Sequence, residues 1–131
     1  MSGAKPGART RSLQAVLAAK PGAVAVPVAA SRGAQPIGLM YKVMGKVFAI
    51  LSVRGEEYVI LKCDPHLADM LREKYAGVGH RSHLDRRFWI SVSLDADVPK
   101  DEIARLAARS YELICTSLTR KQKAELAALA K

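Results

Sequence analysis

The strongest constraint on the fold is a series of three segments in which apolar and polar residues alternate. They are residues 39–44, 47–53 and 58–63. Alternation with a period of two is typical of β-strands, because successive side chains point to opposite faces of a sheet. The breaks between the segments are short and contain Gly45-Lys46 and Gly55-Glu56. Such short connections join antiparallel neighbours, so we predict a meander of three strands.

Helix signals flank this meander on both sides. Ser12 can cap a short helix that Pro21-Gly22 ends. Asp64-Pro65 combines a preferred N-cap residue with the residue preferred at the first helical position. The predicted second helix ends near Gly77 and has one apolar stripe, formed by Leu67, Met70, Leu71 and Tyr75.

A fourth strand and a long helix complete the pattern. Residues 88–94 alternate again, and Asp97-Val98-Pro99 is a second helix start. Apolar residues then recur at helical spacing, at Ile103, Leu106, Ala107, Leu113, Ile114 and Leu118. Residues 119–131 are compatible with a short further helix, and residues 23–36 with a loop.

The element order predicts one α+β domain with an antiparallel β-sheet and helices packed on one face. We place the domain at residues 12–131. Residues 1–11 contain Gly, Pro, Ser, Lys and Arg without periodicity, and we expect a flexible basic tail.

The positive charge is concentrated in the first part of the chain. The formal net charge is +9. Residues 1–55 contain eight Lys or Arg and no acid, and the first acid is Glu56. A positive field favours nucleic acid, anionic surfaces or acidic partners, although it can also serve solubility alone.

Cysteine usage and hydropathy favour a cytoplasmic protein without a membrane span. Cys63 and Cys115 form no CxxC pair, which indicates reduced thiols. No run of 18 apolar residues is present. The acid-free N-terminal segment, rich in Ala and Arg, also suits an organelle transit peptide, which remains an alternative. No phosphate loop or catalytic triad is recognisable, and we expect no cofactor.

The segment GHRSHLDRRFWISV at residues 79–92 contains the one tryptophan. Alternation predicts that Phe88 and the apolar residues in phase with it face the helices. Arg87, Trp89, Ser91 and Ser93 then share the other face. An aromatic ring there can stack on a base or an Arg plane, or it can simply close the open face of the sheet.

The charged residues of this segment favour an anion over a metal. His80, His83 and Asp85 have spacing that is usable for a metal. Positive charge opposes a bound cation, however, and three arginines (Arg81, Arg86, Arg87) lie in the same segment. Guanidinium groups suit phosphate or carboxylate far better. The alternative is a solvated loop in which the arginines pair with Asp85 and Glu73. Lys42 and Lys62, on predicted strands, could join Arg87 on one positive sheet face.

Several motifs together resemble the MmcQ/YjbR family. Tyr41–Ala49 (YKVMGKVFA) resembles its first hairpin, and LKCDP at 61–65 its Lys-Cys-Asp-Pro signature. SHLDRRFW at 82–89 is similar to its His-Met-Asn-Lys-x-x-Trp segment, and Ser110-Tyr111-Glu112-Leu113 also matches. The resemblance covers roughly residues 39–118. It implies a CyaY-like, frataxin-type two-layer sandwich and a DNA-binding description, with no enzymatic activity established. The family motif positions are Lys46, Lys62, Cys63, Asp64, Pro65, His83, Arg87 and Trp89.

The chain departs from this family at several positions. Residues 23–38 contain neither the acid nor the Pro-Phe-Gly motif that usually follows the first helix. Asp85 stands where asparagine is usual, and Phe88 where histidine is common. The iron binding of frataxins needs an acidic helix and edge, which the acid-free residues 1–55 do not offer.

We therefore expect a non-enzymatic module that binds nucleic acid, DNA in particular, with low sequence specificity. The alternative is a pocket for an anionic small molecule or an acidic protein, formed by Lys62, His83, Arg87 and Trp89. An enzyme using Cys63 or His83 is a third hypothesis, and we expect no catalytic residue. The candidate binding residues are Lys42, Lys46, Lys62, His83, Arg86, Arg87 and Trp89.

Overall fold

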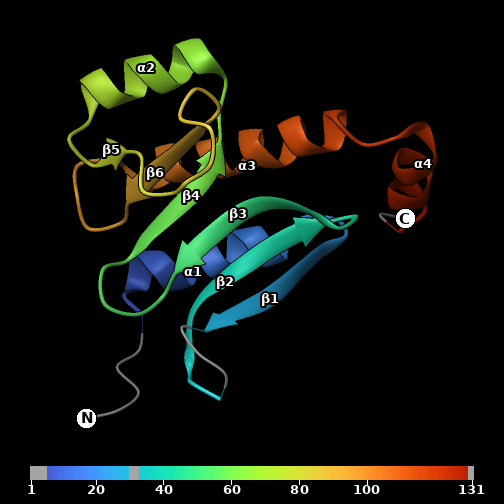
Figure 1. Ribbon diagram of the computed structural model, residues 1–131, viewed down its shortest axis with the longest axis horizontal. Coiled ribbons are helices and arrows are strands. Elements are labelled where there is room, and N and C mark those ends of the chain that lie inside the picture. The colour runs from blue at the N-terminus through green and yellow to red at the C-terminus, as the bar shows by residue number, and fades with distance from the viewer. Residues whose placement is uncertain (1–5, 30–32, 130–131) are drawn as a thin grey trace.

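One antiparallel sheet organises the computed structural model, which describes residues 6–29 and 33–129. Within these residues the sheet has six strands in the order β1-β2-β3-β4-β6-β5. The predicted meander forms its centre, as β2, β3 and β4 (Figure 1). The strands are β1 (Ala23–Ala29), β2 (Pro36–Val43), β3 (Lys46–Ser52), β4 (Tyr58–Lys62), β5 (Val78–Gly79) and β6 (Trp89–Ser93).

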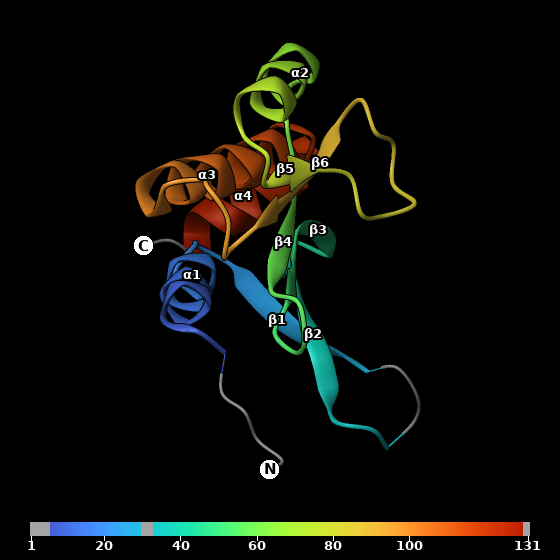
Figure 2. The same cartoon turned by 90° about the vertical axis from the view of Figure 1, so that its left-hand side faces the viewer.

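Helices cover one face of this sheet. Figure 2 shows α1, α3 and α4 on the same side, with α2 at the end of the sheet near β5. Their bounds are α1 (Ala8–Ala18), α2 (Pro65–Lys74), α3 (Lys100–Thr116) and α4 (Arg120–Leu129). The predicted α+β class, with an antiparallel sheet and helices on one face, is thereby confirmed. We call the side of the sheet opposite α1 and α3 the open face.

The core lies between the sheet and α1 and α3. Alternate residues of the strands point into it, as predicted from the period of two, and they are almost fully buried: Tyr41, Val43, Leu51, Val59, Leu61, Ile90 and Val92. Phe48 joins them, and its ring meets the ring of Tyr111 on α3 edge-on, with centroids 5.1 Å apart.

A β-bulge explains why Phe48 points inward. Along β3, Ala49 pairs with Tyr41 but Val47 pairs with Lys42, so the register between β2 and β3 shifts at this point. The extra residue breaks the alternation. Residues on either side of the bulge therefore do not face where strict alternation would place them.

Three expectations about the elements are corrected. Residues 23–29, predicted as a loop, form the edge strand β1. The predicted flexible tail is too long, because α1 begins at Ala8 and Thr10 is only 1% exposed. Met70, assigned to the apolar stripe of α2, is 64% exposed, because this helix packs at the end of the sheet and buries only a narrow side. Residues 1–5 of the predicted tail lie outside the described residues.

In the part of the chain that the structure describes, no helix is long and apolar enough to cross a membrane.

Candidate functional site

Three of the predicted binding residues share the open face. Lys42, Lys62 and Trp89 each stand next in sequence to a residue that is buried against the helices, namely Tyr41, Leu61 and Ile90. Their side chains therefore point the other way. Lys62 on β4 is the direct cross-strand partner of Trp89 on β6. Lys42 stands two strands away, on β2.

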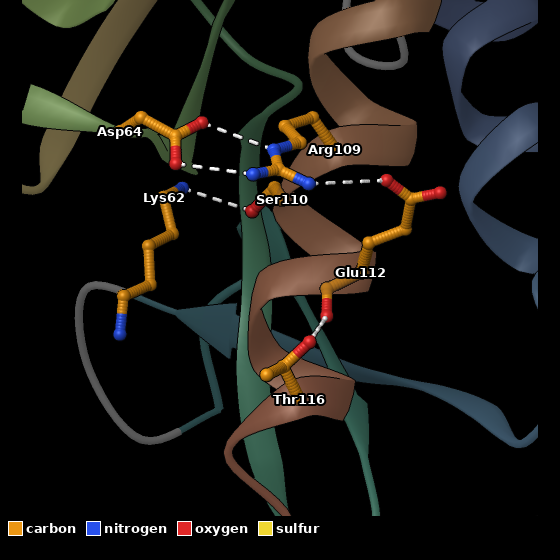
Figure 3. Close-up of polar contacts among 6 residues, drawn as sticks. All are labelled: Lys62, Asp64, Arg109, Ser110, Glu112 and Thr116. Carbon is orange, nitrogen blue, oxygen red and sulfur yellow. Dashed lines mark hydrogen bonds and ion pairs between the residues drawn. The ribbon is translucent and has the colours of Figure 1, made fainter. Parts of the chain in front are cut away.

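The backbone at Lys62 is held by a serine from α3. Ser110 is fully buried, and its hydroxyl accepts a hydrogen bond from the Lys62 N–H at 2.9 Å. The same hydroxyl donates to the Phe48 carbonyl at 2.6 Å. Figure 3 shows Ser110 beside the Lys62 backbone, while the Lys62 ammonium extends away from the neighbouring Asp64. These two backbone groups lie just beyond the last pair of β3 and β4, Ala49 with Leu61, so the serine bridges the two strands at this end of β4.

Asp64 joins this end of β4 to α3 and does not cap α2 through its side chain. Its carboxylate accepts two hydrogen bonds from the Arg109 guanidinium, at 3.0 and 3.1 Å. Glu112 stands 3.6 Å from the same guanidinium (Figure 3). The hydrogen bond from Arg109 holds the pKa of Asp64 below its usual value. This carboxylate is therefore ionised and engaged at neutral pH.

The Lys-Cys-Asp-Pro junction lines a shallow depression of about 300 Å³. Phe88 and Leu113 complete its wall. Cys63 is buried, and burial raises the pKa of its thiol to about 11, with the Asp64 carboxylate adding to the shift. The thiolate is the nucleophilic form of cysteine. A raised pKa is therefore unfavourable for the hypothesis of a catalytic Cys63.

The segment from His80 to Phe88 arches over the open face (Figure 2). His80 Nε2 lies 2.6 Å from the Leu84 carbonyl. The Phe88 N–H donates to the Asp85 carbonyl at 3.0 Å, so residues 85–88 form a turn. Arg87 therefore precedes the strand, and strict alternation does not place it beside Trp89.

Arg72 on α2 is a structural residue that the sequence analysis missed. One nitrogen of its guanidinium donates to the Arg86 carbonyl at 2.7 Å and to the Trp89 carbonyl at 3.0 Å. Its side chain is 13% exposed, and Asp69 stands 3.5 Å away on the same helix. Arg72 thus fastens the end of the 80–88 segment to α2. An arginine in the last turn of a helix gives no sequence signal for such a contact.

The arginines of the 80–88 segment differ in their partners. Arg81 pairs with Glu56, and its guanidinium lies 4.6 Å from the centre of the Tyr58 ring. Arg87 pairs with Asp85 at 2.9 Å, and the hydrogen bond lowers the pKa of this carboxyl. Arg86 has no ion pair among the described residues. His83 is exposed.

Lys46 stands apart from the other candidates. It pairs with Val43, whose side chain is buried on the helix side. Its ammonium donates to the Ser117 carbonyl at 3.0 Å, just beyond the last residue of α3. A cation there stabilises the negative end of the helix dipole. Lys46 therefore lies away from the open face.

No metal cluster is present among the described residues: nowhere in residues 6–29 and 33–129 do three His, Cys, Asp or Glu side chains gather around a possible ion site. His80 instead contacts a backbone carbonyl, and Asp85 engages Arg87.

The fold and this face define the class: an α+β domain in which, within the described residues, helices cover one side of the sheet. The chain belongs to the YjbR family, whose sequence model matches residues 18–113. This confirms the family predicted from the motifs.

Relatives of this chain are found in Escherichia coli. The protein called "Uncharacterized protein YjbR" of strain K12 is 35% identical over 72 residues, which span 54% of this chain and 61% of that protein. The "Uncharacterized protein YbdF" of strain O157:H7 is 25% identical over 85 residues, or 64% of this chain and 70% of that protein.

Two crystal structures are similar in fold. Deinococcus radiodurans protein DR2400, described with the domain DUF419, superposes with a TM-score of 0.78 at 22% identity, over 89% of this chain and 86% of that one. A Pseudomonas syringae protein gives a TM-score of 0.56 at 24% identity, over 68% of this chain and 86% of that one.

Proposed function

We propose that the protein is a non-enzymatic module that binds nucleic acid on the open face of its sheet, with low sequence specificity. The observation that carries this proposal is the cross-strand pair of Lys62 and Trp89 on that face. An aromatic ring can stack on any base, and an adjacent ammonium can contact a phosphate. The pair therefore combines the two contacts that sequence-tolerant binding uses.

The surroundings of this pair support the proposal. Arg72 holds the backbone carbonyls of Trp89 and Arg86 at once, so the Trp89 ring and the Arg86 side chain both project from a fixed backbone. Lys42 adds a second ammonium on the same face. Such contacts are made to the phosphates and to the flat sides of the bases, and neither kind of contact depends on the nucleotide sequence. Low specificity follows from that chemistry.

The alternative, a pocket for an anionic small ligand, has weaker support. A pocket was expected from Lys62, His83, Arg87 and Trp89, but the depression at Lys62 is lined by none of the other three. Asp64 lies in its wall, and a carboxylate disfavours an anion. We therefore rank this alternative below nucleic acid.

Fluorescence of Trp89, the one tryptophan, tests the proposal directly. Short single-stranded and duplex DNA should quench it, and the log of the affinity should fall linearly with the log of salt concentration. The slope is about 0.9 per phosphate contacted in duplex and about 0.7 in single strands. Lys62→Gln should reduce the slope by the amount expected for roughly one phosphate contact.

Lys46→Gln is the matched control, because it removes the same charge from the other side of the molecule. It should weaken binding less than Lys62→Gln. An unquenched Trp89 at low salt with every DNA tested contradicts the proposal.

A further inference from the structure

A second hollow on the open face lies away from Lys62 and Trp89. Its volume is about 440 Å³, and its lining includes Val28, Gly38, Ile50, Ser52 and Tyr58. Gly38 pairs with Val28 on one side and with Ser52 on the other. Gly38 and Ser52 are small and stand between the larger side chains of Val28 and Tyr58. The sheet is therefore not covered by side chains at this point, and the hollow results.

The lining of this hollow is apolar and its edge is positive. Val28, Ile37, Ile50 and Tyr58 provide most of the wall. Arg54 lies at the edge and donates to the Pro36 carbonyl at 3.1 Å. Arg81 lies against the Tyr58 ring and neutralises Glu56, the one acid in the lining. A flat uncharged ring attached to an anionic chain is complementary to this arrangement.

Apolar surface also extends from the hollow along β1, β2 and β3 toward Lys42. Met40 and Ile50 are cross-strand partners on this surface, whereas Ile60, the partner of Ile50 on β4, is buried. Val24 and Val26 on the edge strand extend the same surface and are 59% and 38% exposed. Tyr58 and Lys62 bound β4, so they lie about 13 Å apart at about 3.3 Å per residue.

We propose that this hollow holds a base of the same strand that contacts Lys62 and Trp89, so that the ligand is single-stranded nucleic acid. This inference rests on the proposed function. A base exposes its flat sides only outside the duplex, and the apolar surface can bury them. Four steps between stacked nucleotides, at about 3.4 Å per step, span about 14 Å, so a strand of about five nucleotides matches the distance of about 13 Å between Tyr58 and Lys62.

A second copy of the chain fits this surface less well. Each copy has a formal net charge of +9, so two open faces would bring like charges together around Arg54. A duplex could reach the lysines with its phosphates, but its stacked bases could not enter the hollow.

The test compares strands that are long enough to reach both the hollow and the Lys62–Trp89 pair with strands that are too short to do so. Quenching of Trp89 is titrated with thymidine oligonucleotides of about two and about eight nucleotides and with a duplex of about eight pairs, at one salt concentration. One stacked base contributes about 1–3 kcal/mol, so the longer strand should bind at least about fivefold more tightly than the duplex.

Val28→Asp places a carboxylate in the hollow without touching the Lys62–Trp89 pair. It should weaken binding of the longer strand about fivefold or more, by loss of one stacked base, and leave binding of the shorter strand unchanged. Val28→Asn, of nearly equal size and uncharged, should lose less. Circular dichroism of both variants checks that each is folded.

Several results overturn the inference and are distinguishable from failure of the proposed function. Equal affinity for strand and duplex, or an unchanged affinity of Val28→Asp for the longer strand, would show that no base occupies the hollow. The proposed binding of nucleic acid would not be affected by either result. A wild-type dimer that Val28→Asp dissociates assigns the hollow to a second copy, and displacement of the strand by poly-glutamate assigns it to an acidic protein. If Trp89 responds to none of the nucleic acids, the proposed function fails and this inference with it.

Discussion

At the scale of single residues, Ser110 is the clearest link between the core and the open face. Its hydroxyl stands between the Lys62 N–H and the Phe48 carbonyl, two groups just beyond the last pair of β3 and β4. All three groups lie in or beside the core. Buried backbone groups that lose a partner cost the full free energy of their desolvation. The serine is therefore important for stability although it is far from any proposed ligand contact.

Ser110→Ala should lower the free energy of unfolding by about 1–3 kcal/mol, because two buried backbone groups lose their partner. Urea unfolding followed by circular dichroism measures this change. Thr116→Ala is the matched control: Thr116 lies on the same helix, but its hydroxyl bonds the Glu112 carbonyl at an exposed position. The control should lose less than about 0.5 kcal/mol. Equal losses in the two variants would mean that Ser110 adds no more than an exposed helical hydroxyl.

At the scale of elements, α2 and β6 are coupled through Arg72, which holds the end of the 80–88 segment by two backbone carbonyls. Arg72→Met keeps most of the aliphatic stem but removes the donors. Hydrogen bonds to charged groups contribute about 1.5–3 kcal/mol, so the segment should open more often. Hydrogen exchange of residues 80–88 should accelerate, and Trp89 emission should move to longer wavelength.

Arg105→Met is the control for this experiment, because Arg105 on α3 is exposed and pairs with Glu102 on its own helix. Exchange in the 80–88 segment should be unchanged in this variant. If Arg72→Met also leaves exchange unchanged, the turn at 85–88 holds itself through its own hydrogen bonds.

Most elements could be predicted from the sequence because their patterns are local. The alternation of β2 to β4 and β6 and the helix starts at Pro65 and Pro99 gave the right types in the right order. The edge strand β1 was missed because its small residues and Pro27 are typical of a loop. Proline is tolerated on an edge strand, where its missing N–H leaves no gap in the sheet. Only the pairing with β2 reveals this strand.

The candidate site was predictable where alternation holds and not elsewhere. Lys62 and Trp89 lie within regular strands, and they share the open face as expected. Arg87 lies in a turn, and Lys46 lies beyond a bulge, so period-two reasoning could not place either. The contacts of Arg72, Ser110 and Asp64 join residues that are distant in sequence, and no local pattern indicates them.

At the scale of the whole molecule, α2 is attached to the rest of the fold by ionised carboxylates. It buries only Ala68 and Leu71 along its length. Near its start, Asp64 binds Arg109 of α3. Just beyond its end, Asp97 accepts hydrogen bonds from the N–H groups of Ala76 and Gly77, both at 2.8 Å. Because apolar burial is small, these charged contacts have a large share in holding α2, and through Arg72 also the Trp89 segment.

Acid should therefore loosen this end of the molecule first. The pKa of Asp97 is lowered by the hydrogen bonds from Gly77 and Ala76, and that of Asp64 by the hydrogen bond from Arg109. A lowered folded-state pKa gives stability that is present above the unfolded value of about 3.9 and is lost as pH falls through the folded value. Urea midpoints at neutral pH should thus exceed those measured below about pH 4, and Trp89 emission should shift within the same acidic range.

Asp97→Asn should unfold more easily at neutral pH and show a weaker dependence on acid. Asp95→Asn is the control, because Asp95 is exposed and takes part in neither contact, and this variant should behave as the wild type does. An unchanged acid dependence in Asp97→Asn would show that α2 is held by its packing and not by these carboxylates.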